Sequence, residues 1–195
     1  ELRVKHNTVV LGVGPFDPYE FYAKRGPIRT ADDIKGKVWA TTGAIDARAI
    51  QLMGGSPTGM PSSELYLAFD RGVIDGTPRP LLTGVGRSLF EVAKHLSLAT
   101  FGVDTSILAI NSKKWDSLPA DIQEIIKRAA KQRDKEQFEM VDAFVKDALK
   151  NFEAKGMKIN RIEAAEIERM KKLTAPAVTE WVAKVPEGRK YLELI

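Results

Sequence analysis

Apolar positions follow two patterns: short runs in the first part of the chain and helical periodicity from residue 117 onward. The segments TVVLGVG (8–14), KVWATTG (37–43) and TSILAIN (105–111) are short runs rich in apolar and β-branched residues. Runs of this length, interrupted by glycine, proline or polar clusters, predict buried strands. Val73 and Ile74 are predicted to begin another strand, and MKINRI (157–162) a further one.

Helical segments separate these strands. Asp46 is placed to cap a helix, and Ser62 or Ser63 to cap a shorter one that ends at Gly72; residues 88–96 (SLFEVAKHL) are amphipathic. Thr30 and Asp33 have the spacing of a capping box before a single short turn. Strands alternating with helices predict an α/β fold with a largely parallel or mixed sheet.

Residues 117–156 are predicted to be helical for nearly their whole length, with a glycine as the stop. Between two apolar stripes lies KQRDKEQ (131–137), which is polar on every side. Such a helix can pack on two separate bodies and cross the space between them, and the alternative is a kinked pair of surface helices on one body. The stripes are Ile122, Ile125, Ile126 and Ala129, then Phe138, Val141, Val145, Leu149 and Phe152. Two closing helices are expected at 163–173 and 176–185, with Pro176 at the start of the second.

Composition narrows the class of protein. With 44% hydrophobic and 29% charged residues the chain is of ordinary globular composition, and no apolar run approaches the length of a membrane span. The absence of cysteine excludes disulfides, thiolate zinc sites and cysteine nucleophiles. The net charge is +4, and the lysine and arginine residues are interleaved with aspartate and glutamate. They form no basic stripe, which argues against nucleic-acid binding.

Catalytic constellations are sparse. His6 and His95 are the only histidines, and neither lies in a motif with the several convergent donors that a metal site needs. Asp32 and Asp33 form a carboxylate pair, but their place at a helix start explains them as partners of the helix dipole. The sequence therefore predicts no enzyme mechanism, no metal and no cofactor.

A binding site is indicated instead by aromatic and cationic residues near strand ends, where open α/β sheets bind ligands. They include Tyr19, Trp39 and Arg79, which stands between two prolines. An arginine there can hold a carboxylate by two parallel hydrogen bonds. The alternatives are core packing for Trp39 and a solvated loop for Arg79, although flanking prolines cost adaptability that a solvated side chain has no need to lose.

Three segments resemble the DctP-type solute receptors of tripartite ATP-independent periplasmic (TRAP) transporters. They are PIRTADDIKGKVW (27–39), GGSPTGMPSSELYLAFDRGVIDG (54–76) and WDSLPADIQEIIKRAA (115–130), and they occur in the order found in that family. The resemblance covers residues 14–156.

The resemblance implies a two-lobed α/β binding protein of the periplasmic type II-like kind, with a long helix that bridges the lobes. The expected domains are 1–15 and 80–118 as a remnant of lobe one, 16–79 as lobe two with the ligand site, 117–156 as the bridging helix, and 157–195 as a closing strand and helices. It also implies capture of a small organic carboxylate in the periplasm, delivery to membrane permease subunits, and neither catalysis nor a cofactor.

The chain departs from the family pattern in three ways. It is expected to begin partway through lobe one, and a fragment of this kind would expose apolar surface and self-associate. The family's carboxylate-binding arginine falls on Trp39 or Ala40, and neither can pair with a carboxylate. At a position where sialic-acid-binding relatives have asparagine, this chain has Arg79.

The last two departures suggest one hypothesis for the site. Arg79 takes over the ligand carboxylate, Trp39 and Tyr19 stack on the ligand body, and Ser62 adds a hydroxyl contact. Thr105 and Ser106 are weaker candidates. Two other classes of function remain open: a ligand-sensing domain of a signalling protein with the same fold, and an enzyme or basic partner-binding protein, which only the mildly high pI supports.

Overall fold

The computed structural model describes residues 2–185 and 188–192, which form two compact units. Unit 1 comprises residues 1–18 and 102–149, and unit 2 comprises residues 19–101 and 150–195. Residues 80–101, expected with lobe one, fall in unit 2. The reason is that their strands pair within the sheet of unit 2 and their side chains Leu81, Leu89 and Leu96 are buried.

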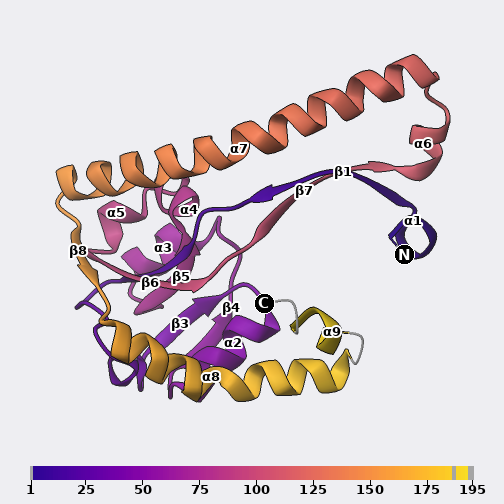
Figure 1. The fold of residues 1–195 in the computed structure, drawn as a ribbon. Helices are drawn as coiled ribbons and strands as arrows, with labels where there is room; N and C mark the ends of the chain where they lie inside the picture. The colour runs from indigo at the N-terminus through magenta and orange to yellow at the C-terminus, as the bar shows by residue number, and fades with distance from the viewer. Residues whose placement is uncertain (1, 186–187, 193–195) are drawn as a thin grey trace. The chain divides into compact units, whose positions relative to one another are not determined.

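Unit 1 is built on a two-stranded antiparallel ribbon, visible in Figure 1 as β1 beside β7. β1 spans Thr8–Pro15 and β7 spans Thr105–Asn111, which agrees with both predicted strands. Thr8 pairs with Asn111 and Pro15 with Thr105, with a bulge between Val10 and Gly12. The other elements of the unit are α1 (Leu2–His6), α6 (Ser112–Asp116) and most of α7 (Ala120–Ala154).

The long helix α7 is continuous over Ala120–Ala154, without a kink that would divide it into two surface helices (Figure 1). Its polar middle does not cross open space as predicted but hydrogen-bonds the ribbon. Arg133 Nη2 donates to Ser106 Oγ at 2.6 Å, and Asp134 Oδ2 accepts from the Val13 N–H at 3.1 Å. One side of this stretch is therefore polar because it binds strand groups, while its other residues are exposed.

Glycines in β1 make this close approach of helix and ribbon feasible. A Cβ at Gly12 would collide with the Asp134 carboxylate, and one at Gly14 would collide with the Gln137 amide. Gln137 Nε2 donates to the Pro15 carbonyl oxygen at 2.7 Å. The glycines of GVG thus serve helix packing and not a phosphate loop.

Unit 2 is organised around a six-stranded mixed sheet of order β4-β3-β5-β2-β6-β8. β3 is parallel to β4 and to β5, β2 is antiparallel to β5, and β6 is parallel to β8. The strands are β2 (Tyr19–Ala23), β3 (Val38–Thr41), β4 (Ser56–Gly59), β5 (Gly76–Pro80), β6 (His95–Gly102) and β8 (Lys158–Arg161). The helices are η1 (Ala31–Ile34, a 3-10 turn), α2 (Ala44–Leu52), α3 (Leu65–Asp70), α4 (Leu81–Gly86), α5 (Leu89–Val92), α8 (Ala164–Lys184) and α9 (Arg189–Leu192).

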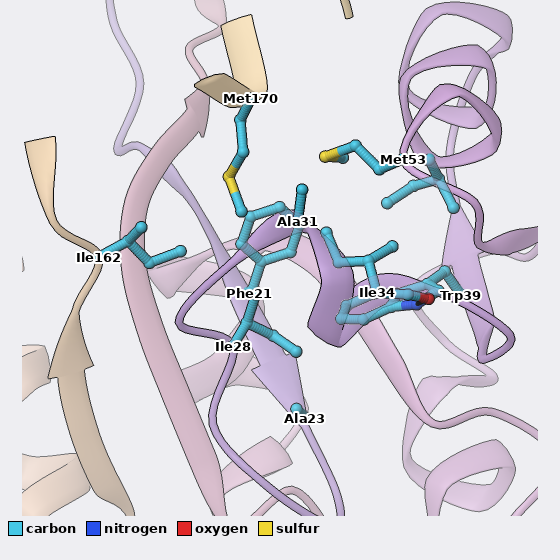
Figure 2. Close-up of a cluster of buried hydrophobic side chains, with 10 residues drawn as sticks. Phe21, Ala23, Ile28, Ala31, Ile34, Trp39, Met53, Ile162 and Met170 are labelled. Carbon is cyan, nitrogen blue, oxygen red and sulfur yellow. Dashed lines mark hydrogen bonds between the residues drawn. The ribbon is translucent and has the colours of Figure 1, made fainter. Parts of the chain in front are cut away.

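A cluster of buried apolar side chains forms the main core of unit 2, with contributions from β2, η1, β3, α2 and α8 (Figure 2). Phe21 lies at its centre, edge-on to Trp39 with ring centroids 5.6 Å apart. On the other side of the same strand, Tyr22 meets Phe152 at 6.1 Å. Because successive strand residues point to opposite faces, β2 is covered on both sides. The remaining members of the cluster are Ala23, Ile28, Ala31, Ile34, Ile50, Met53, Ile162 and Met170.

Several sequence predictions in unit 2 are wrong. Residues 19–23 form a strand that was not among the predicted ones, and the strand expected at Val73 begins at Gly76 instead. The predicted helix 88–96 is one turn of helix followed by β6, whose Leu96 and Ser97 are buried in the sheet. Pro176 lies inside α8, because Met170 and Ala177 on either side of it are both buried and hold one continuous helix.

Candidate functional site

The candidate site lies at the carboxyl ends of β3, β4 and β5 in unit 2. β3 is the common neighbour of the other two strands, and all three run in the same direction. Tyr19 lies at the same edge, since it begins the antiparallel strand β2 and pairs with Pro80 at the end of β5. Parallel strands leave their last carbonyl groups at a shared edge, which is where open sheets bind ligands.

Arg79 is the central residue of this edge. It lies within β5, with 1% of its surface exposed, and its guanidinium joins the ends of three strands. Nη1 donates to the Pro78 carbonyl oxygen at 2.8 Å and to that of Ala40 at 3.4 Å, while Nη2 donates to that of Met60 at 3.0 Å. The solvated-loop alternative for Arg79 is therefore wrong.

Prolines 78 and 80 are unusual in a strand with neighbours on both sides, because proline has no N–H for the ladder. Side chains add donors here: Thr77 Oγ1 donates to the Ala40 carbonyl oxygen at 2.8 Å, and Arg79 Nη1 donates to the same oxygen. The sequence TPRP thus holds β5 against β3 through side chains, and it fixes the backbone that carries the guanidinium.

The guanidinium of Arg79 has no ionic partner among the described residues. Its hydrogen bonds all go to backbone carbonyls, and Nε is buried without any acceptor. No ion pair of the described residues includes Arg79. Burial lowers its pKa, against the opposing effects of Asp46 and Tyr19. A buried arginine remains charged, so this edge carries a positive charge on which Asp46 acts, but with which no carboxylate of the described residues forms an ion pair.

The N-terminus of α2 adjoins this edge, directly after β3. Asp46 accepts hydrogen bonds there from the N–H groups of Thr42 at 2.7 Å and Gly43 at 2.8 Å. The helix begins at Ala44, so Asp46 closes a capping box from inside the first turn. Its carboxylate therefore binds the N–H groups of the two residues that precede the helix, and it places a negative charge at the helix N-terminus.

Tyr19 and Ser62 are the predicted site residues that the structure brings to the same edge as Arg79. Tyr19 is half-buried and interacts electrostatically with the guanidinium. Ser62 is half-buried and follows Met60 by two residues, so it lies just beyond the carbonyl that Arg79 binds.

Trp39 is not available to a ligand, contrary to the stacking role predicted for it. Its side chain is fully buried, and its indole Nε1 donates to the Ile34 carbonyl oxygen at 3.2 Å. Figure 2 shows it beside Ile34 within the apolar cluster. Core packing, the alternative that the sequence left open, describes Trp39.

Thr105 and Ser106, the weaker candidates, belong to unit 1. Thr105 is exposed and pairs with Pro15 in the ribbon. The Ser106 hydroxyl accepts from Arg133 at 2.6 Å and from Gln137 at 2.7 Å. These contacts fix Ser106 to the long helix. The site described here is built from residues of unit 2 alone.

Sequence reasoning missed the groups that hold the guanidinium. The carbonyls of Ala40 and Met60 carry no side-chain signal, and Asp46 was interpreted only as a helix cap. The carboxylate of Glu20 was also missed: it is buried opposite Arg79 in the β2–β5 register and accepts from the Ala99 and Thr100 N–H groups. A polar residue among the apolar positions of 19–23 was the available signal.

The described residues contain no cluster of three or more histidine, cysteine, aspartate or glutamate side chains that could hold a metal ion. No helix in the described ranges is long and apolar enough to cross a membrane. The two histidines belong to different units, His6 to α1 and His95 to β6.

Comparison with protein families gives one match that covers most of the chain. The model for "Bacterial extracellular solute-binding protein, family 7" (DctP) matches residues 3–184. Among curated proteins, the C4-dicarboxylate-binding periplasmic protein DctP of Rhodobacter capsulatus is 28% identical over 112 residues, which is 57% of this chain and 34% of that protein.

Solved structures match over a larger share of this chain than the curated protein does. A TRAP periplasmic solute-binding protein from Sulfitobacter, with bound β-D-galacturonate, has a TM-score of 0.89 and 26% identity over 96% of this chain and 62% of that one. One from Desulfovibrio salexigens, with bound orotic acid, has a TM-score of 0.90 and 25% identity over 98% of this chain and 62% of that one. The chain thus spans about a third of the curated relative and under two thirds of the solved ones. These matches confirm the predicted fold class.

Proposed function

Because the chain belongs to bacterial extracellular solute-binding protein family 7, we propose that it acts in a TRAP-type receptor that binds a small organic carboxylate. The family is one of solute-binding proteins, which agrees with the prediction of a binding protein and not an enzyme. The relatives compared are named as periplasmic, and the periplasm is the proposed place of action.

One observation carries the proposal: the buried Arg79 guanidinium that forms no ion pair with a carboxylate of the described residues. A buried charge without a paired counter-ion is costly, and a ligand carboxylate would supply that partner. Nη1 is fully engaged by two carbonyls, whereas Nε and one hydrogen of Nη2 are not. A carboxylate would therefore bind Arg79 from the side, through Nε and Nη2, and because the guanidinium is buried, the groups that cover this side must move to admit it.

The place of Trp39 supports the same assignment. Where the family pattern puts a carboxylate-binding arginine, this chain has Trp39 or Ala40, and both side chains are fully buried. The positive charge at this edge is instead that of Arg79 in β5. Thr77, two residues earlier in the same strand, also donates to the Ala40 carbonyl oxygen. Tyr19 would contact the ligand body, and Ser62 would add a hydroxyl contact.

Membrane permease subunits are the proposed partners, as in a TRAP system. The relatives compared are solute-binding proteins, and they lend no support to the alternative of a ligand-sensing domain in a signalling protein.

A thermal-shift screen of the 195-residue chain across carboxylic acids tests the proposal. A ligand at about a hundred times its Kd stabilises a protein by about 2.7 kcal/mol, which raises the Tm measurably. D-Galacturonate and D-galactose form a matched pair, because they differ in having a carboxylate or an alcohol at C6. Stabilisation by acids and not by their neutral counterparts is expected; stabilisation by neutral or cationic solutes alone would contradict the proposal.

A further inference from the structure

We infer that the site selects ligands with a single carboxylate over dicarboxylates, an inference that rests on the proposed function. The chemistry at the edge of unit 2 provides for one negative charge. Relatives in the comparisons include both a C4-dicarboxylate-binding protein and one with bound galacturonate, which has one carboxylate, so the family alone does not decide this.

Among the described residues, Arg79 is the cation that hydrogen bonds place at the edge. Arg79 is the guanidinium that joins the ends of β3, β4 and β5. Of the described residues, the charges that shift its pKa are Asp46 and Tyr19, and neither is a cation. On α2, the Arg48 guanidinium is already held by Glu180, with Nη2 2.8 Å from the carboxylate.

The N-terminus of α2 already carries a negative charge. The N–H groups of Thr42, Gly43 and Ala47 donate to the Asp46 carboxylate, at 2.7, 2.8 and 3.0 Å. An aspartate in this place presents a negative charge to any second carboxylate nearby.

Backbone donors at the edge are also few. Pro61, Pro78 and Pro80 have no N–H, and the Met60 N–H donates to the Thr41 carbonyl oxygen at 3.0 Å. A carboxylate beyond the one at Arg79 would therefore lose its water without gaining charged or N–H partners from these groups.

The consequence is a difference in affinity between acids that match in size and differ in charge. A second carboxylate enters as a desolvated charge beside Asp46, so we expect it to weaken binding about tenfold or more. A neutral amide or alcohol in the same place has no such cost, since its desolvation is smaller than that of a charge.

Isothermal titration calorimetry on the intact chain tests this with two pairs of probes: succinamate against succinate, and D-galactonate against galactarate. Each pair keeps the carbon skeleton and changes one end between a neutral group or alcohol and a carboxylate. We expect the monoacid of a pair to bind at least about tenfold more tightly at neutral pH. Equal or tighter binding of the diacid would overturn the inference while leaving the proposed carboxylate receptor intact.

Failure of the proposed function gives a different result, in which neutral analogues such as succinamide and galactose bind as well as any acid. The Asp46→Asn variant sharpens the test, because asparagine keeps an oxygen acceptor for the α2 N–H groups and removes the charge. We expect it to narrow the ratio between monoacid and diacid, whereas Asp32→Asn, at the separate turn η1, is expected to leave the ratio unchanged. If Asp46→Asn does not fold, the probe pairs on the unaltered chain still decide the question.

Discussion

The indole ring of Trp39 occupies the space in which a side chain at Gly76 would begin. A Cβ built at Gly76 collides with three atoms of the six-membered ring, and Trp39 pairs with Gly76 across β3 and β5. Gly76 is thus required by Trp39, which lies 37 positions earlier in the chain, and the two residues pack together in the core of unit 2.

Gly76→Ala is therefore expected to destabilise the protein by about 1–3 kcal/mol, because the fully buried ring has no space to move into. Denaturant unfolding followed by tryptophan fluorescence measures the change. Gly26→Ala is the matched control, since nothing lies within 4 Å of a Cβ there. Equal stability of the two variants would contradict this packing.

Ser62 and Tyr19 are expected to contribute less to ligand affinity than Arg79. Removal of one neutral hydrogen bond costs about 0.5–1.5 kcal/mol, so Ser62→Ala is expected to weaken binding about two- to tenfold. Ser63→Ala is the control, because Ser63 is the exposed neighbour. Calorimetry with the acid selected by the thermal-shift screen measures both, and an equal effect of the two variants would remove Ser62 from the site. Tyr19→Ala, which removes the ring, is expected to weaken the binding of the same acid as well.

His95 gives the stability a dependence on pH. It pairs with Lys158 across β6 and β8, and burial, followed by the charges of Lys158 and Arg29, lowers its pKa below the ordinary 6.5. The unfolded chain therefore takes up this proton first, and the free energy of unfolding is expected to fall as the pH falls through about 6.5. Chemical unfolding at several pH values measures the slope. His95→Asn is expected to flatten it, and an unchanged slope would contradict the assignment.

Self-association through the ribbon of unit 1 stays a prediction. Val13 and Ile107 pair across β1 and β7 and expose 49% and 60% of their surfaces, and neither strand carries a charged residue. Edge strands without charges pair readily with another copy. Sedimentation velocity is expected to show association that Ile107→Lys reduces, while Val73→Lys, at an exposed apolar residue of unit 2, has little effect. A monomeric unaltered chain would contradict the prediction.

Local signals in the sequence predicted much of the fold. The Thr30–Asp33 capping box is present, with Asp33 Oδ2 accepting from the Thr30 N–H at 2.9 Å, and Gly156 takes the positive φ expected of a helix stop. The strand 105–111 and the long helix were found because their period is strong over their length. These features depend on neighbours in the chain.

What the sequence did not reveal depends on distant contacts. Trp39 could be core or ligand contact until Gly76 and Ile34 were placed beside it. A solvated loop was the open alternative for Arg79, yet TPRP lies in a strand that side-chain donors hold to Ala40. Arg79 was identified from its local sequence, but its burial and its carbonyl partners come from the ends of other strands.

The measurement that tests the central claim most directly is calorimetric titration of the acid selected by the screen into the unaltered chain, Arg79→Lys and Arg79→Gln. Because the guanidinium also joins three strand ends, folding of each variant is checked by circular dichroism and thermal unfolding. The account predicts a loss of affinity of about a hundredfold or more for folded Arg79→Gln and a smaller loss for Arg79→Lys. A folded Arg79→Gln variant that binds the same acid with unaltered affinity would contradict it.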